Sequence, residues 1–304
     1  TDKTNKTLGF GIFYAMVNFG ASVGPLVAGQ LRAISWNYAF MAAAICTVIM
    51  LLITIFFYKE PEREEQNSTL GDKLSEIWEV LSDVKFSAFL IILGTFFWLP
   101  FWAFFNMLAL YIDSSLDTIE LYHNLEGIFG ATFLSVLSET DENGVSRILG
   151  ETISHTGYII FIFQVFVSRV SESFKAIPTF LTGLLIISIG FFVLGYANVG
   201  PVSMVFFGIL LFAIGEMVAS PRIQEYITWI APKEKAGLYM GTNFLAVGIG
   251  GALSGVTYTS LYGYFENQGH VEYVWYSLAA HQIVGILLIY GYVKVLGEFK
   301  ELEK

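Results

Sequence analysis

Charged residues and cysteine are both scarce in this 304-residue sequence. Charged side chains make up only 14% of it, against about 25% in a typical soluble domain. The net charge is −10 and no basic patch is present, which excludes nucleic acid as a partner. The single cysteine, Cys46, cannot form a disulfide within the chain, so cysteine usage does not indicate a compartment.

Motifs of catalytic and metal sites are absent as well. The four histidines show no HExxH or other metal-ligand spacing, and neither a GxSxG turn nor a Walker A loop occurs. We therefore expect no metal, no cofactor and no enzymatic activity.

Long apolar runs take the place of the missing charges. Hydrophobic residues make up 55% of the chain, and a bilayer core about 30 Å thick needs roughly 20 apolar residues per helix. The runs do not alternate in polarity, which favours helices over a transmembrane barrel. The sequence therefore predicts an all-α transmembrane protein whose eight spans lie near 8–31, 36–58, 86–112, 154–171, 177–198, 201–221, 237–262 and 275–296.

The Lys and Arg residues predict the orientation of these spans. If eight helices alternate in direction, every basic residue except Arg32 and Arg147 falls on the same side. Basic residues favour the cytoplasmic side of a membrane. We therefore expect both ends of the chain, the C-terminus included, to be cytoplasmic in a multi-pass protein of the cell (inner) membrane.

Two long connections divide the chain. Residues 59–85 predict a charged cytoplasmic linker, and apolar residues at helical spacing within 70–84 predict a short amphipathic helix. Residues 113–153 predict an acidic outer insert, either an interfacial helix with a solvated loop or a docking site for a partner. The expected units are 1–58, the linker 59–85 and a bundle over 86–304.

Glycines spaced four apart predict close contacts between helices. Gly20 and Gly24 share one face of the first span, as do Gly251 and Gly255 of the seventh. Small residues at this spacing allow transmembrane helices to approach closely.

A few polar side chains interrupt the apolar runs. Tyr14 and Asn18 lie four apart and share a helix face, and Asn106 and Asn243 interrupt the third and seventh spans. An amide that is unpaired inside a membrane is costly. Each of these residues therefore either bonds a neighbouring helix or lines a wet cavity.

Glu216 is the most unusual of these residues. A charged side chain at the bilayer centre costs roughly 2.5–3.5 kcal/mol on insertion scales. No basic residue precedes Arg222 at the end of the same run. The carboxyl is protonated, faces a water-filled cavity with a cation, or bonds another helix as a structural group.

Four segments carry a resemblance to a known family. They are "FGIFYAMVNFGAS" (10–22), "WNYAFMAAA" (36–44), "FWAFFN" (101–106) and the stretch from "GEMVASP" to "IAPKEKAGLYMGTNFL" (215–245). They resemble helices five, six, seven and ten to eleven of the proton-dependent oligopeptide transporter family, within the major facilitator superfamily. The resemblance covers the chain apart from 113–153 and implies a fragment of eight spans, equivalent to helices five to twelve of twelve. It implies that 1–58 holds the last two helices of the N-terminal bundle and that 86–304 is the six-helix C-terminal bundle with the outer insert 113–153.

The resemblance also implies roles for the polar residues. Glu216 matches the helix-ten acid that receives a peptide amino group, and Asn18 matches a helix-five amide, with Tyr14 one turn away. The helix-seven acid of the family falls on Asn106, which cannot titrate, and a pocket tryptophan falls on Asn243.

These observations lead to one functional prediction and two alternatives. We expect a monomeric secondary transporter that moves a small organic solute, peptide-like or amine-bearing, with proton coupling and alternating access. Glu216 would bind the amine or a proton, while Tyr14, Asn18, Asn106 and Asn243 would orient the substrate. The alternatives are a carrier or exporter of another solute class, such as a sugar or drug, and a membrane receptor or scaffold that transports nothing.

Cysteine accessibility tests the expected orientation. In a background with Cys46 replaced, single cysteines at 65 and 299 should resist an impermeant thiol reagent added outside, and one at 143 should react. Labelling of position 65 from outside would contradict the orientation.

Overall fold

Helices account for nearly all of the structure. The computed structural model describes residues 6–59, 69–171, 174–232 and 235–297. The elements are α1 (Lys6–Ile34), α2 (Trp36–Phe57), α3 (Leu70–Ser82), α4 (Val84–Leu93), the π-helix η1 (Gly94–Trp98), α5 (Leu99–Ser115), α6 (Thr118–Phe129), α7 (Ala131–Leu134), β1 (Ser138–Thr140), β2 (Ser146–Ile148), α8 (Gly150–Ile153), α9 (Gly157–Ser171), α10 (Ala176–Val199), α11 (Met204–Ile230), α12 (Ala236–Asn267) and α13 (Glu272–Leu296).

Six helical segments of the described chain are long and apolar enough to cross a membrane. They are Trp36–Phe57, Val84–Ser115, Ala176–Val199, Met204–Gln224, Gly237–Asn267 and Glu272–Leu296. The prediction of a multi-pass, all-α membrane protein is therefore confirmed.

The two other predicted spans, 8–31 and 154–171, fall on α1 and α9. These helices have 29 and 15 residues. At 1.5 Å per residue α9 is about 22 Å long, shorter than a bilayer core is thick.

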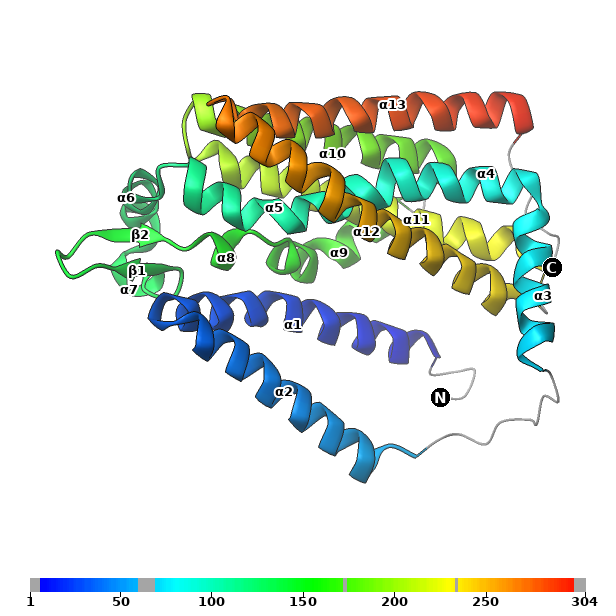
Figure 1. The fold of residues 1–304 in the computed structure, drawn as a ribbon, viewed down its shortest axis with the longest axis horizontal. Coiled ribbons are helices and arrows are strands. Elements are labelled where there is room, and N and C mark those ends of the chain that lie inside the picture. The colour runs from blue at the N-terminus through cyan, green and yellow to red at the C-terminus, as the bar shows by residue number, and fades with distance from the viewer. Residues whose placement is uncertain (1–5, 60–68, 172–173, 233–234, 298–304) are drawn as a thin grey trace.

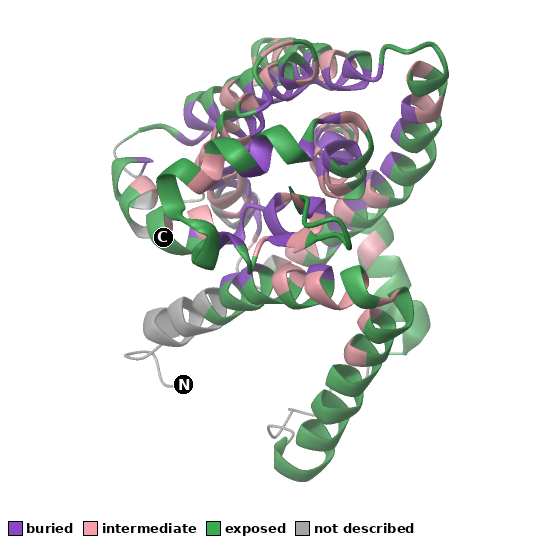
Figure 2. Ribbon diagram, turned by 90° about the vertical axis from the view of Figure 1, so that its left-hand side faces the viewer, coloured by how far each residue is buried: buried purple, intermediate pink, exposed green. Residues whose placement is uncertain are grey.

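The helix α2 diverges from the remaining helices, whereas α1 lies along the bundle, next to α8 and α9 (Figures 1 and 2). No residue of α2 is buried, although the helix is almost entirely apolar. Apolar surface of this extent is not stable in water. The exposed α2 therefore requires lipid or further protein around it.

Direct backbone contact joins α10 to α11. A Cβ added at Gly183 would lie 2.8 Å from the carbonyl oxygen of Gly215, and one at Gly215 would lie 2.7 Å from the carbonyl oxygen of Gly183. Only glycine permits this approach, because any side chain would overlap the backbone of the facing helix. Glu216, the next residue along α11, is held in place by this contact.

Aromatic side chains fill the centre of the bundle. Phe104 of α5 stacks on Phe212 of α11 with ring centroids 3.7 Å apart, and both residues are fully buried. The Tyr111 hydroxyl, also on α5, donates a hydrogen bond of 2.7 Å to the carbonyl oxygen of Leu194 on α10. Helices α5, α10 and α11 thus share one core.

The π-helix η1 interrupts the long segment Val84–Ser115 where α12 crosses it (Figure 1). A Cβ added at Gly250 of α12 would lie 2.7 Å from the carbonyl oxygen of Gly94 and 2.8 Å from the Cβ of Trp98. Such wider turns occur frequently at functional sites. Here the turn lies against the backbone of α12.

The helix α3 lies across one end of the bundle, within the stretch 70–84 whose spacing predicts an amphipathic helix (Figure 1). Thr69 and Asp72 form a capping box at its start, and the hydrogen bonds from Thr69 lower the pKa of Asp72. The Lys235 Nζ, beside α12, lies 2.8 Å from Glu79 Oε1 of α3. Positions 65 and 299, chosen above for cysteine labelling, lie outside the described residues.

The prediction of close helix contacts at Gly20 and Gly24 is wrong for the described part of the chain. A Cβ added at either glycine, or at Gly255, would meet nothing there within 4 Å, whereas one at Gly251 would contact Trp102. Spacing alone does not indicate which glycine faces another helix.

A pair of variants on α12 tests the crossing with η1. We expect Gly250→Ala to lower the free energy of unfolding by about 1–3 kcal/mol, because the new methyl group overlaps the η1 backbone. Gly255→Ala should be neutral or slightly stabilising, because its methyl group would meet open space. Thermal unfolding of the purified variants measures both, and equal melting temperatures would contradict this packing.

Candidate functional site

The candidate site centres on Glu216, near the middle of α11. Its side chain is half-buried. The Thr156 hydroxyl, just before α9, donates a hydrogen bond of 3.1 Å to Glu216 Oε2. A hydroxyl donor stabilises a carboxylate without neutralising its charge, so the carboxylate can still bind a cation or a proton.

The start of α9 also lies against α1. A Cβ added at Gly157 would lie 2.9 Å from Ser22 Oγ and 3.0 Å from the backbone of Ala21. The Ser22 hydroxyl donates a hydrogen bond of 2.8 Å to the backbone carbonyl of Asn18, one turn earlier on the same face. The segment Thr156–Gly157 therefore connects the helix that carries Glu216 to the helix that carries Asn18.

Asn18, one of the predicted site residues, is buried on the face of α1 that meets α9. Tyr14 lies one turn earlier on α1, where the structure does not describe side chains.

Asn106 connects α5 to α12. Its Nδ2 donates a hydrogen bond of 2.9 Å to Ser254 Oγ, and Ser254 is fully buried. Asn106 itself remains exposed, so its side chain both joins the two helices and can be reached from outside the bundle.

Asn243 differs from the other amides. It is fully buried in α12, and neither its Nδ2 nor its Oδ1 has a hydrogen-bond partner among the described residues. Tyr239, one turn earlier, packs its ring against Phe86 of α4. Asn243 follows Tyr239 by one turn on that helix face.

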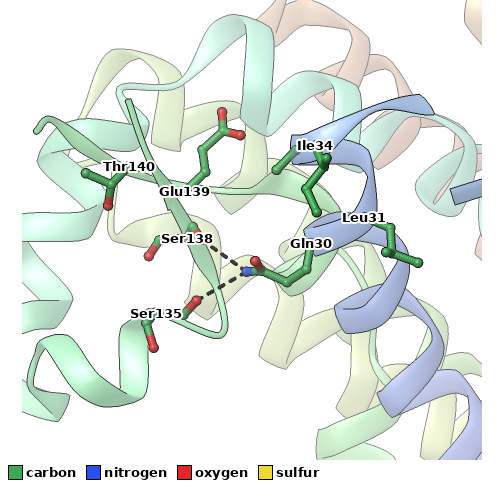
Figure 3. Close-up of a pocket in the computed structure, with 8 residues that line it drawn as sticks. Gln30, Leu31, Ile34, Ser135, Ser138, Glu139 and Thr140 are labelled. Atoms are coloured by element: carbon green, nitrogen blue, oxygen red, sulfur yellow. Dashed lines mark hydrogen bonds between the residues drawn. The ribbon is translucent and has the colours of Figure 1, made fainter. Parts of the chain in front are cut away.

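Hydrogen bonds fasten the far end of α1 to the insert formed by residues 113–153 (Figure 3). The Gln30 Nε2 lies within 3.3 Å of the carbonyl oxygens of Ser135, Val136 and Ser138. Gln30 and residues of this stretch line a hollow of about 440 Å³.

An ion-pair cluster reinforces this attachment. The Arg32 guanidinium lies 3.0 Å from Asp113 Oδ2 and 2.5 Å from Glu151 Oε1. All three side chains are partly buried, and burial raises the pKa of Glu151. Arg32 thus bridges α1, α5 and α8, at what we call the insert end of the molecule.

Sequence reasoning missed Thr156, Ser22, Ser254 and the contacts of Arg32. Single hydroxyls in apolar segments carry little signal. Arg32 did carry one, because it is among the two basic residues that fall on the sparsely charged side. Among the described residues, no group of three or more His, Cys, Asp or Glu side chains could hold a metal ion.

Comparison with known proteins identifies the fold. The model of the Major Facilitator Superfamily matches residues 1–140. A crystal structure of a POT family transporter in complex with 5-aminolevulinic acid superposes with a TM-score of 0.68, covering 96% of this chain and 70% of that one at 18% identity. The chain has the major facilitator superfamily fold. The resemblance drawn from the motifs is confirmed at this level.

Other relatives are similar over much of the chain. A peptide transporter POT in complex with sulfate gives a TM-score of 0.62 at 15% identity, covering 99% of this chain and 70% of that one. The "Uncharacterized MFS-type transporter YttB" of Bacillus subtilis (strain 168) is 25% identical over 234 residues, which are 76% of this chain and 51% of that protein. "Multidrug resistance protein MdtH" of Aeromonas salmonicida (strain A449) is 22% identical over 276 residues, 89% of this chain and 60% of that protein. The chain thus spans about half to 60% of the length of these two curated relatives.

A charge substitution tests the ion-pair cluster of this facilitator fold. In Arg32→Gln, Asp113 and Glu151 lose their shared cation, so α1 should separate from the insert end. The distance distribution between spin labels at Ala33 and Asn124 should broaden or lengthen. Lys235→Gln is the control, because Lys235 pairs with Glu79 of α3, at the other end of the bundle from the insert (Figure 1). Identical distributions for Arg32→Gln and the unsubstituted protein would contradict this role.

Proposed function

We propose that this chain belongs to a secondary active transporter of small amine-bearing organic solutes, peptide-like molecules among them. The observation that carries the proposal is Glu216, a half-buried carboxylate in an apolar helix that accepts a hydrogen bond from the neutral donor Thr156. Ionisable residues in membrane helices mark substrate or proton pathways.

Glu216 would bind either the substrate amine or a proton. An ammonium group forms charge-assisted hydrogen bonds with a carboxylate, and these are about twice as strong as neutral ones. A proton on the carboxylate removes this attraction. Competition between the two ligands at one group would couple substrate movement to a proton gradient.

Polar groups on neighbouring helices would orient the rest of the substrate. Asn18 lies on the face of α1 that meets the start of α9. The side chain of Asn106 is exposed although it donates a hydrogen bond to Ser254. The complexes of POT family transporters with 5-aminolevulinic acid and with a thioalcohol conjugated peptide support this class of ligand. Tyr14 and Asn243 remain part of the proposal as orienting groups.

The contacts of Arg32 and Gln30 suggest that the two bundles are closed against each other at the insert end. They join α1, of the expected N-terminal bundle, to the insert of the C-terminal bundle. Rocking of the two bundles around a site near the midplane would break and remake such contacts during alternating access. We assign the insert end to the outside and the C-terminus to the cytoplasm of a cell (inner) membrane, in a monomeric protein.

An exporter of drug-like compounds is the second candidate. The match to "Multidrug resistance protein MdtH" covers 89% of this chain. A carboxylate in a membrane cavity suits a cationic drug as well as a peptide amine. The direction of transport therefore separates the two candidates.

A matched pair of ligands tests the role of Glu216. In the full-length protein, Glu216→Gln preserves side-chain shape but removes the charge. Loss of a charge-assisted hydrogen bond costs about 1.5–3 kcal/mol, which is roughly a ten- to hundredfold weaker affinity for 5-aminolevulinic acid. Levulinic acid, which lacks the amine, should bind the variant and the unsubstituted protein with similar affinity. Calorimetry or competition for uptake measures both affinities.

The control is Glu79→Gln, on the exposed surface of α3, which should change neither affinity. Unchanged affinity of Glu216→Gln for 5-aminolevulinic acid, together with a lower folded yield, would show that Glu216 is a structural hydrogen-bonding group. That result would reject the proposed amine site.

A further inference from the structure

A second cavity lies away from Glu216, beneath the insert. It has a volume of about 750 Å³, is open on one side, and is bordered by α1, α6, α7, the segment around α8, α9 and α11. Its lining consists of Leu26, Leu125, Phe129, Phe133, Val136, Leu137, Thr152, Ile153, His155, Tyr158, Ile159, Phe206 and Ile209. Pockets for small molecules usually measure about 300–1,000 Å³ and are mostly apolar.

Three polar side chains interrupt this apolar lining. The Thr152 hydroxyl already donates to the backbone carbonyls of Leu149 and Leu137. The imidazole of His155 is only 8% exposed and lies close to the backbone of Thr152, but neither nitrogen has a hydrogen-bond partner of ordinary geometry among the described residues. The buried Tyr158 hydroxyl also has no partner there, and its ring lies 4.4 Å from the His155 ring.

Unpaired buried polar groups are costly, and most in native proteins have a partner. Two of them at one wall of an apolar cavity therefore point to a ligand that supplies the missing hydrogen bond. No Asp, Glu, Lys or Arg lines the cavity, so nothing there would compensate a charged ligand. The phenyl rings of Phe129, Phe133 and Phe206 favour aromatic groups.

We propose that this cavity is a second binding site, which takes a neutral, lipophilic aromatic molecule with one hydrogen-bonding group. The aromatic part contacts the phenylalanines of the insert and of α11, while the polar group meets His155 and Tyr158. The ligand enters from the membrane, where such molecules concentrate.

This site is distinct from the proposed amine site. Glu216, Asn18 and Asn106 do not line the cavity. On α11, Ile209 precedes Glu216 by two turns, which corresponds to about 10 Å along the helix. Binding here depends on neither the charge of Glu216 nor transport.

Benzophenone is a suitable probe, because it is neutral and aromatic, carries one carbonyl acceptor and reacts with nearby C–H bonds under ultraviolet light. In the full-length protein in lipid nanodiscs, we expect saturable labelling of peptides that contain residues 125–137, 152–159 and 206–209. Diphenylmethane has the same two rings without the carbonyl, so it should compete more weakly than unlabelled benzophenone.

Two neighbouring residues of α11 provide matched variants. Ile209→Trp fills the cavity and should lower labelling of these peptides at least fivefold. Phe207→Trp is the control, because Phe207 lies on the exposed face of the same helix and does not line the cavity. His155→Phe retains a ring but removes both nitrogens, so the half-saturating benzophenone concentration should rise about three- to tenfold.

Several results would overturn the proposal. Labelling spread evenly over exposed residues such as Phe207, or labelling that does not saturate, would show partition into lipid only. Equal labelling of Ile209→Trp and the control would exclude the cavity, and if that variant does not fold, an unchanged response of His155→Phe would exclude the hydrogen bond. A phospholipid that native mass spectrometry finds bound and that benzophenone does not displace would also reject the proposed ligand.

Discussion

The direct contact of two helix backbones at Gly183 and Gly215 sets the position of the candidate site. Because α10 and α11 touch without intervening side chains, α11 cannot shift or rotate without a collision. Glu216 follows Gly215, so this close contact fixes the part of α11 from which its carboxylate meets Thr156, just before α9. The placement of a costly charge is thus determined by packing next to it, and a fixed carboxylate can discriminate ligands better than a mobile one.

Polar side chains between the other helices follow the constraint that a membrane imposes. Water is absent from the bilayer core, so a buried donor needs a partner in the protein. Two polar groups of the long helix α12 meet this requirement: Ser254 accepts from Asn106, and the Tyr258 hydroxyl lies 2.7 Å from His281 Nδ1 of α13. These bonds connect α12 to α5 and α13 on the insert side of its crossing with η1.

The insert combines two properties that bear on function. Its rim is polar and charged, and there Gln30 and Arg32 fasten α1 to it. Its inner face is apolar and covers the cavity that His155 borders. His155 and Thr156 are consecutive, so one short segment contacts both the cavity and the carboxylate of Glu216.

The sequence by itself determined the membrane class, six of the spans and the anomaly of Glu216, because apolar run length and a lone charge are local properties of the chain. Tertiary structure alone decided which side chains form hydrogen bonds with Glu216 and Asn106. Thr156 reaches Glu216 across 60 residues of sequence, and Ser254 reaches Asn106 across 148. It also decided that Gly183 packs against a neighbouring backbone while Gly20 does not, although both lie in apolar helices. Which face of a helix meets another helix depends on the rotation of the helix about its own axis and on the angle at which it crosses its neighbour. Residue spacing within one helix encodes neither.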